Sequence, residues 1–517
     1  MLVEQEPDCF GDLRLDQLLA TLLAGRDEYK LAPFFYTPLR DPETVHYRHA
    51  VARDLEDSAI FAAITTFTEQ MRRMRRQLTQ ATKLFYPYQK AYWFLDAVAT
   101  YCGAVNALTT ALPRLETRSS GLQAFGDYLS AYRASSAFVA LEAEAQSLRS
   151  DLANIQYCVH IQGNRVTVTT YQGESDYSAE VVESFAKFEQ TQEGATKDYR
   201  VKFKDWPEMN HVEAHILDLV ARLNSTVFQA LSQFGANHRD YLDPTVSAFD
   251  REIQVYLAYQ ELIARFQPIH LPFCYPDVST QSKETAIYDT CDLALASALV
   301  TQKTPMVRND VTLQDPERIL VITGPNQGGK STFARMVGQV HYLASLGLAI
   351  PGAKARVFLP DHIFTHFERE EDLATLHGKL EDEVVRIHAI LEQATGDSLI
   401  IMNESFASTT LQDSLYLGEQ VLQRILKLGA LAVYVTFVDE LASLDERVVS
   451  LVGLIGLDTP GERTYKIVRR PADGRAYALA IAEKYGLTYD TLRERVDART
   501  DIPAPAASTG SERLVAQ

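Results

Sequence analysis

The chain has 517 residues, of which 46% are hydrophobic and 23% charged, and its formal net charge is −18. The length predicts two or three domains, and the composition excludes a wholly disordered protein. The acidic balance argues against a protein that holds nucleic acid by a general basic surface, so any DNA contact has to come from a local patch.

The amino terminus and the cysteines indicate a reducing compartment. Residues 1–19 carry acids where a secretory signal has a basic stretch, and no apolar segment is long enough to span a bilayer. The five cysteines are odd in number and never spaced as CxxC, which is typical of free thiols. We therefore expect a cytoplasmic protein with no membrane contact.

After an amino-terminal segment (residues 1–30), residues 31–270 are predicted to be mainly helical. The stretch 55–85 has apolar residues at helical spacing and contains no Gly or Pro. Near 157–171 the helical spacing of apolar residues gives way to apolar residues at every second position, on both sides of Gly163-Asn164. This pattern predicts a β-hairpin with its turn at Gly163-Asn164.

The second half, residues 271–497, begins at a Pro-bearing stretch and is predicted to be α/β. Short β-branched runs alternate with helical segments there, which indicates a parallel sheet with helical crossovers. The predicted strands are 318–323, 398–402 and 431–436. The tail, residues 498–517, is rich in Pro, Ala and Ser and is predicted to be disordered.

The strongest motif follows the strand at 318–323 and fits GxxxxGK[ST] at the start of a helix. Its glycines let backbone N–H groups turn toward phosphates, and the helix amino terminus adds partial positive charge. We expect Lys330 to reach the β and γ phosphates of ATP and Ser331 to bind Mg²⁺. The predicted nucleotide-binding residues are Gly324, Pro325, Asn326, Gln327, Gly328, Gly329, Lys330, Ser331 and Thr332.

The predicted strand at 398–402 is followed by Asn403-Glu404. A nucleotide site needs an acidic residue at the end of a strand, near the magnesium ion, and this segment has that form. Glu404 is the predicted catalytic residue, because its carboxylate can orient the attacking water. The usual residue before this glutamate is aspartate, and the neutral Asn403 offers less charge to Mg²⁺. The alternative interpretation is a buried strand that ends in surface polar residues.

The densest basic cluster lies in the first half of the chain, and its members are Arg72, Arg73, Arg75 and Arg76. The cluster could meet a DNA backbone, which predicts affinity that falls with salt. The alternative is a solvated helix face paired with acids.

The segment ILVITGPNQGGKSTFARMVG resembles the Walker A segment of the MutS family, in which TGPN-x-GGKST is characteristic. Further segments that resemble the family follow in its order, at 342–352, 361–373, 398–413 and 433–444, and 34–57 is similar to the start of its helical core. The resemblance is specific over about 305–497 and weaker over 30–300. It implies an α/β P-loop NTPase domain of the MutS type, preceded by a mainly α-helical core, lever and clamp.

Three positions depart from the family pattern. The resemblance implies a homodimer through the ATPase domain, in which a serine reaches the partner's γ phosphate, and Gly378 stands at that position. Phe437 stands where the family has a histidine that helps sense the γ phosphate, and Asn403 replaces the usual aspartate. We therefore expect nucleotide binding with slow hydrolysis.

Two domains are expected to be absent: the amino-terminal domain of the family members that repair mismatches, and a carboxy-terminal nuclease-like domain. About thirty residues precede the helical core, too few for the domain whose Phe-x-Glu wedge reads a mispair. Only the tail follows residue 497, where a nuclease-like domain would lie.

The leading hypothesis is a MutS-like ATPase that couples nucleotide state to DNA binding in repair or recombination, without readout of a mismatch. The second is a nucleotide-gated scaffold with little ATPase activity and a protein partner. An unrelated ATPase of the ABC or chromosome-organising type is a third, and the missing LSGGQ signature counts against it.

Overall fold

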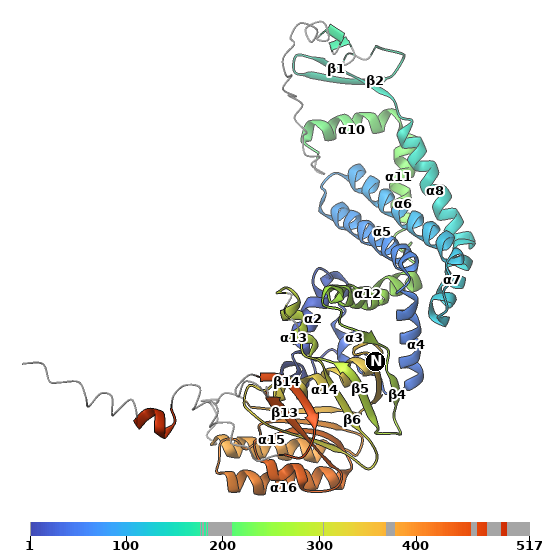
Figure 1. The fold of residues 1–517 in the computed structure, drawn as a ribbon. Coiled ribbons are helices and arrows are strands. Elements are labelled where there is room, and N and C mark those ends of the chain that lie inside the picture. Colours follow the sequence, from blue (N-terminus) through green and yellow to red (C-terminus); the bar gives the residue numbers. More distant parts are fainter. Residues whose placement is uncertain are drawn as a thin grey trace, which may run out of the picture. The chain divides into compact units, whose positions relative to one another are not determined.

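The computed structural model describes residues 2–175, 209–302, 306–368, 378–455, 463–472 and 487–493, together with Thr304 and a few single residues between 177 and 184. The chain divides into two compact units (Figure 1). Residues 50–257 form a helical unit, and residues 1–49 with 258–517 form a sheet-containing unit. The sequence suggested boundaries near residues 30 and 270. The predicted disordered tail, 498–517, lies outside the described residues.

The helical unit is built from long helices and one hairpin. Within it lie α5 (Ser58–Lys83), α6 (Pro87–Ala111), η2 (Leu112–Arg114), α7 (Ser120–Arg133), α8 (Ser136–Ala153), β1 (Tyr157–Gln162), β2 (Arg165–Thr170), α10 (His211–Leu223) and α11 (Ser225–Asn237). Two further helices, α4 (Pro42–Asp54) and α12 (Pro244–Arg265), contain the first and the last residues of this unit and continue beyond them in the sequence.

Helix α5 shows why these segments are helical. The Asp57 side chain accepts hydrogen bonds from the N–H groups of Ala59 and Ile60, at 2.8 and 3.2 Å, and so begins the helix. Its buried apolar residues recur every three or four positions and pack along α6. They are Ile60, Ile64, Phe67, Met71 and Met74.

Strands β1 and β2 form an antiparallel hairpin where the sequence predicts one. Tyr157 pairs with Thr170 and Gln162 with Arg165. The turn needs the left-handed conformation of Gly163, whose φ is 59°. The predicted change of period from helical to alternating spacing therefore marks a real change of structure.

The other unit is organised around a six-stranded sheet. Its strand order is β10-β11-β12-β7-β13-β14, and all neighbours are parallel except β13 and β14. The strands are β7 (Ile319–Thr323), β10 (Ile363–Phe367), β11 (Leu399–Asn403), β12 (Leu431–Val435), β13 (Val448–Ile455) and β14 (Arg463–Arg469). The three runs predicted as parallel strands are thus neighbours in one sheet.

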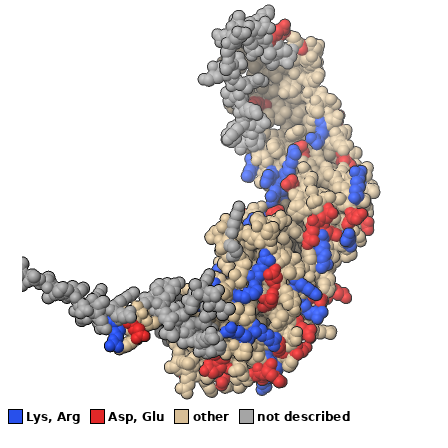
Figure 2. Space-filling view, in the orientation of Figure 1, with Lys and Arg blue, Asp and Glu red and all other residues tan. Residues whose placement is uncertain are grey.

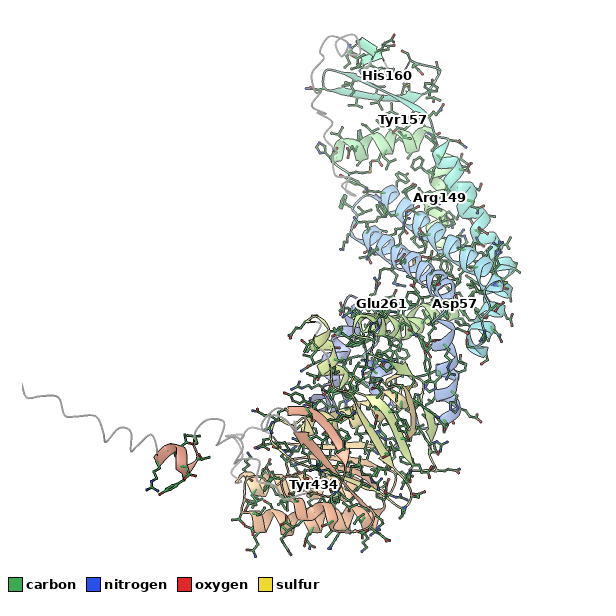
Figure 3. The ribbon with its side chains drawn as sticks, in the orientation of Figure 1. Asp57, Arg149, Tyr157, His160, Glu261 and Tyr434 are labelled. Carbon is green, nitrogen blue, oxygen red and sulfur yellow. The ribbon has the colours of Figure 1, made fainter. Side chains whose placement is uncertain are left out.

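Helices cover both faces of this sheet (Figure 1). Helix α14 (Lys330–Ser345) packs against β11 and β12 on one face. Helices α15 (Lys379–Gln393) and α16 (Leu411–Leu428) share a core with the other face, where Tyr434 of β12 is buried (Figure 3). Burial on both faces explains why β7, β11 and β12 read as continuous apolar runs.

Two smaller sheets and short helices complete the unit. One sheet has the order β4-β9-β5-β6 and the other pairs β3 with β8. The strands are β3 (Phe273–Cys274), β4 (Asp277–Ser279), β5 (Thr285–Thr290), β6 (Asn309–Leu313), β8 (Ile350–Pro351) and β9 (Lys354–Phe358). The helices are α1 (Cys9–Leu13), α2 (Leu15–Leu23), η1 (Asp27–Tyr29), α3 (Ala32–Tyr36), η3 (Gln267–Ile269), α13 (Leu293–Val300) and η4 (Asp439–Ser443). Over the described residues, no helix is long and apolar enough to cross a membrane.

Residues 1–49 belong to this unit, and several of them pack against α14. Leu13 is buried, and its Cδ2 lies so near Gly338 that an added β-carbon there would come within 2.5 Å. The Tyr342 hydroxyl donates a hydrogen bond to the Phe35 carbonyl at 2.8 Å. Helix α1 also contacts the edge strand β10. These contacts join residues far apart in the sequence, which is why spacing alone placed the boundary elsewhere.

Candidate nucleotide-binding site

The predicted phosphate-binding loop connects β7 directly to the first turn of α14. Gly324 and Gly329 have φ values of 120° and 91°, which side chains rarely tolerate. At Gly328, an added β-carbon would lie 2.8 Å from the Pro325 carbonyl oxygen, so the loop can close only with glycine there. The sequence therefore shapes a tight glycine-dependent loop that leads directly into the amino terminus of α14, a place suited to anions.

Lys330 is folded onto this loop. Its Nζ donates to the carbonyl oxygens of Gly324 and Pro325, at 2.9 and 3.3 Å, and to Asn326 Oδ1 at 3.2 Å. Burial lowers the pKa of this ammonium, while the nearby Glu404 carboxylate opposes that shift. The Glu404 Oε1 lies 3.9 Å from Nζ. The loop thus holds a nearly buried cation whose partners are mostly neutral carbonyls.

Strand β11 carries Asn403 and Glu404 to the same edge of the sheet. Because β12 lies between β11 and β7, the two motifs meet where the parallel strands end. Glu404 takes a left-handed φ of 55°, and its N–H donates to the Val435 carbonyl at 2.9 Å. Its side chain is 35% exposed, so the carboxylate is open to a bound ligand.

Asn403 is buried, and within the described part of the chain its Oδ1 accepts no hydrogen bond. A buried amide oxygen without a partner is unfavourable unless something else satisfies it. Its position next to Glu404 at the loop makes a hydrated cation a suitable partner, because Mg²⁺ keeps several of its waters when bound.

The turn after Glu404 is fixed by side chains from three elements. Glu383 of α15 accepts a hydrogen bond from the Phe406 N–H at 2.9 Å, and Ser414 of α16 donates to the Phe406 carbonyl at 2.6 Å. His366 of β10 lies 2.9 Å from the Ser405 hydroxyl. Burial raises the pKa of the Glu383 carboxyl. The position of Glu404 is thereby coupled to α15, the helix that begins after Gly378.

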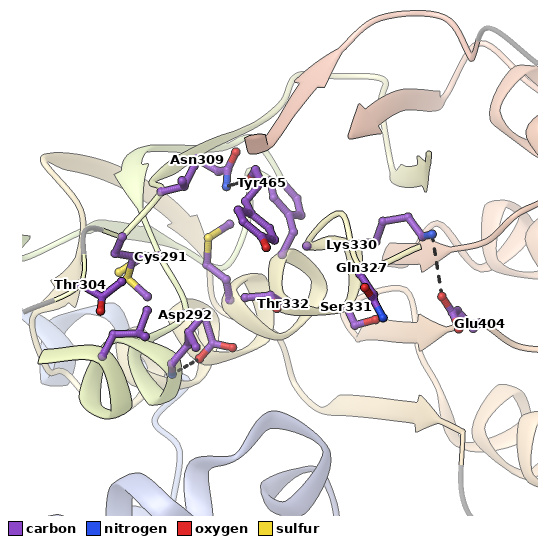
Figure 4. Close-up of a pocket in the computed structure, with 17 residues that line it drawn as sticks. Cys291, Asp292, Thr304, Asn309, Gln327, Lys330, Ser331, Thr332, Glu404 and Tyr465 are labelled. Atoms are coloured by element: carbon purple, nitrogen blue, oxygen red, sulfur yellow. Dashed lines mark hydrogen bonds and ion pairs between the residues drawn. The ribbon is translucent and has the colours of Figure 1, made fainter. Parts of the chain in front are cut away.

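A cavity of about 510 Å³ adjoins the loop (Figure 4). In Figure 4, Lys330 and Glu404 lie on one side of the view, and Cys291, Asp292 and Thr304 lie on the other. The lining residues are Cys291, Asp292, Leu295, Leu299, Thr304, Met306, Val307, Asn309, Gln327, Gly329, Lys330, Ser331, Thr332, Phe333, Met336, Glu404 and Tyr465. This volume lies within the range of small-molecule sites.

Sequence reasoning missed several of these residues. Asp292 is fully buried and pairs with Arg335 of α14 at 3.0 Å, while Gln339 Nε2 donates to Asp292 Oδ1 at 2.9 Å. Asp292 also begins α13, and an Asp before an apolar run is a recognisable helix-start signal. For Tyr465 the sequence offers no such signal, because β14 lies far from the loop along the chain.

The positions that depart from the family pattern differ in surroundings. Gly378 precedes α15 with an ordinary φ of −68°, and among the described residues an added β-carbon meets no atom within 4 Å. Phe437 follows β12 and is 45% exposed. Among the described residues, no packing contact therefore demands a glycine at position 378, and the Phe437 side chain is largely exposed.

The four arginines of α5 do not share one environment. Arg75 forms an ion pair with Asp250, whose side chain is buried. Arg73 and Arg76 are exposed, whereas Arg72 is half-buried. Positive and negative side chains are interspersed on the face shown in Figure 2. Only Arg73 and Arg76 are therefore presented as an open basic pair.

A Phe-x-Glu triplet occurs once in the sequence, at Phe67-Thr68-Glu69. Phe67 lies within α5 and is 2% exposed. Its ring is part of the helical core, so it cannot be inserted between base pairs without unfolding that helix.

Comparisons with known proteins point to one family. The family model of MutS domain V matches residues 320–494. A DNA mismatch repair protein MutS of Ruminiclostridium cellulolyticum is 28% identical over 297 residues, which cover 55% of this chain and 33% of that protein. A DNA mismatch repair protein MutS of Chloroflexus aurantiacus is 30% identical over 200 residues, which cover 37% of this chain and 21% of that protein. The chain thus spans a third or less of the curated relatives that it matches.

Proposed function

Because the chain is a member of the MutS family, we propose that it binds ATP with Mg²⁺ at residues 324–332 and couples the bound nucleotide to DNA binding in repair or recombination. The observation that carries this proposal is the nearly buried Lys330 ammonium, which lines the cavity. Loop carbonyls accept its hydrogen bonds, and its Nζ lies 3.9 Å from Glu404 Oε1. A polyanion would give this ammonium a charged partner in place of neutral carbonyls.

The residues present fit ATP and magnesium. The glycine-dependent loop provides the phosphate cradle, and the cavity is large enough for the nucleoside. Ser331 and Asn403 would hold Mg²⁺, with Asn403 Oδ1 gaining the partner that it lacks among the described residues. The ion would supply charge neutralisation of the phosphates.

Glu404 is the proposed catalytic residue. Its carboxylate is partly open and fixed by a strained backbone, so it can accept a proton from, or orient, the attacking water. Asn403 leaves the magnesium side with less negative charge than an aspartate would give. Gly378 and Phe437 further reduce γ-phosphate contacts, which supports slow turnover.

The second candidate is a nucleotide-gated scaffold with a protein partner, which binds ATP and scarcely hydrolyses it. The three departures favour this candidate, whereas the retained Glu404 favours an active ATPase. Turnover at saturating ATP separates them, since both predict the same nucleotide affinity.

We further propose a homodimer through the ATPase unit and DNA binding without mismatch preference. The buried Phe67 supports the second point, because the only Phe-x-Glu triplet of this sequence cannot serve as a wedge. A dimer is supported by the relatedness alone.

A DNA panel tests the coupling. The protein is titrated against matched, mismatched, branched and single-stranded DNA at fixed ionic strength, without nucleotide and with Mg²⁺-ATP or Mg²⁺-ADP. We expect affinity for at least one DNA to change with the nucleotide, and matched and mismatched duplexes to bind alike. A mismatch preference above about tenfold, or DNA binding indifferent to nucleotide on every substrate, would contradict the proposal.

A further inference from the structure

The connection between α5 and α6 brings aromatic and basic side chains together. Residues 83–92 read KLFYPYQKAY, with aromatic residues before and after the second lysine. Phe85 is 83% exposed, more than any other large hydrophobic side chain that the structure describes. Its ring meets that of Tyr86 edge to face, with centroids 5.3 Å apart. An aromatic ring held this far into water is stabilised when a flat ligand covers it.

Exposed basic residues lead along α5 to this ring. Arg73, Arg76 and Lys83 follow one another at steps of three and seven residues, which places them on one face of the helix. All three are exposed, and so is Lys90 in the first turn of α6. Among the described residues, none of these four cations forms an ion pair. The face therefore offers positive charge to an anionic chain that runs toward Phe85.

A cavity in the helical unit begins on α6 a few residues after Phe85. Its volume is about 290 Å³, and four of its lining residues are the aromatic Tyr88, Tyr92, Tyr157 and Phe228. The ring of Tyr88 packs edge to face on that of Phe228, with centroids 5.0 Å apart. Tyr92 is 47% exposed, so one wall of the cavity also faces solvent. These rings give a planar heterocycle a surface on which it can stack.

We propose that residues 83–92, together with Arg73 and Arg76, bind single-stranded DNA. The basic side chains hold its phosphates, while Phe85 and the cavity on α6 take its unstacked bases. This inference rests on the proposed DNA binding and names the kind of DNA that this site favours. Each unpaired base has a face free for an aromatic ring, whereas the bases of a duplex are stacked on one another. A duplex therefore meets this surface through its phosphates alone.

The test separates the bases from the backbone. Anisotropy titrations at fixed ionic strength, without nucleotide and with Mg²⁺-ATP, use three labelled probes of equal length: oligothymidine, a strand of abasic sites and a matched duplex. We expect wild type to bind oligothymidine most tightly. Phe85→Ala and Tyr92→Ala should each weaken oligothymidine by about tenfold, the loss of one base–aromatic stack, and leave the other probes within about twofold. Phe85→Trp keeps a ring and should bind as wild type does.

Two further variants complete the comparison. Arg73 and Arg76 changed together to Ala should weaken all three probes, because every probe has the phosphates or the backbone charge that they contact. Tyr47→Ala removes a ring of α4 that is 49% exposed and should change none of the affinities. Circular dichroism melting establishes that each variant is folded.

Three results would overturn the inference. Equal losses on oligothymidine and the abasic strand, or no loss, in Phe85→Ala and Tyr92→Ala would remove these rings from base contact. Duplex bound as tightly as oligothymidine by wild type would show that the site does not favour single strands, while DNA binding itself stands. If wild type binds none of the probes with or without Mg²⁺-ATP, the proposed DNA binding fails and this inference fails with it.

Discussion

At the scale of single residues, the site combines retained and altered groups. The loop, Ser331 and Glu404 keep the chemistry of an ATPase, and Asn403, Gly378 and Phe437 depart from it. Gly378 has an ordinary φ, and no described residue lies within 4 Å of an added β-carbon, so the described part of the fold does not demand a glycine here. Of the three altered residues, Gly378 can therefore be replaced without a clash with any described residue.

The rate of ATP hydrolysis should fall in Glu404→Gln and rise in Asn403→Asp. Glu404→Gln should lower ATP hydrolysis by about a hundredfold or more while ATP stays bound, because the carboxylate that handles the water's proton is lost. Asn403→Asp should raise turnover by restoring charge at the magnesium side. Phosphate release at saturating ATP measures both, with Gly378→Ser as a variant that the structure accommodates. Hydrolysis at the wild-type rate in Glu404→Gln would remove Glu404 from its role.

His341 of α14 should make the sheet-containing unit sensitive to acid. It is fully buried, and desolvation lowers its pKa to about 4 from an ordinary value of 6.5. Between those values the unfolded chain binds a proton that the folded chain does not, so stability falls as the pH drops from about 6.5 to 4. The loss should be on the order of 1 kcal/mol per pH unit.

The comparison for this prediction is His341→Leu, which cannot titrate. Unfolding free energies of both proteins at pH 7.5 and pH 5 isolate the effect of this residue from that of other groups. An equal pH dependence in the two proteins would show that His341 does not contribute.

At the scale of elements, local patterns predicted more than long-range packing. The continuous apolar runs of β7, β11 and β12 and the spacing in α5 identified those elements, because burial imposes a period on the sequence. The loop and Glu404 followed from motifs. Tyr465, Asp292 and the packing of residues 9–36 on α14 did not, since each depends on contacts between segments distant in the chain.

The contact between α1 and α14 should be sensitive to one methyl group. Gly338→Ala would place a β-carbon 2.5 Å from Leu13 Cδ2 and 2.7 Å from Ile401 Cδ1. We expect a loss of about 1–3 kcal/mol, as for other overpacked cores. Hydrogen exchange of the amides in α14 and β11 reports the opening free energy of this unit.

Two variants sharpen that prediction. Gly103→Ala is the control, because no described residue outside the helix lies within 4 Å of its added carbon in α6, and it should be neutral or stabilising. Leu13→Ala combined with Gly338→Ala should cost less than the sum of the two single changes, because the shortened side chain leaves room. Strict additivity would indicate that the two residues do not touch.

At the scale of the whole molecule, net charge and local charge have to be separated. The chain is acidic overall, so DNA affinity depends on patches such as the exposed Arg73 and Arg76. Arg75 serves the fold instead through its ion pair with the buried Asp250. The four arginines that the sequence groups together thus divide into two roles.

Salt titrations of DNA binding should show this division. Replacing Arg73 and Arg76 by Ala should weaken all DNAs alike and reduce the slope of log affinity against log salt by about 2, or about 1 for each phosphate contact. Arg75→Ala should mainly lower the stability of the helical unit. Arg133→Ala, an exposed arginine on α7, is the matched control. An unchanged slope in the double variant would exclude this pair from the DNA contact.

The central claim is that residues 324–332 bind ATP, and calorimetric titration of Mg²⁺-ATP into wild type and Lys330→Ala tests it most directly. The account predicts saturable binding of one ATP per chain in wild type and none detectable in Lys330→Ala, because the variant removes the ammonium that the loop holds for the phosphates. Circular dichroism melting shows whether the variant remains folded. ATP affinity within about twofold of wild type in a folded Lys330→Ala protein would contradict the account.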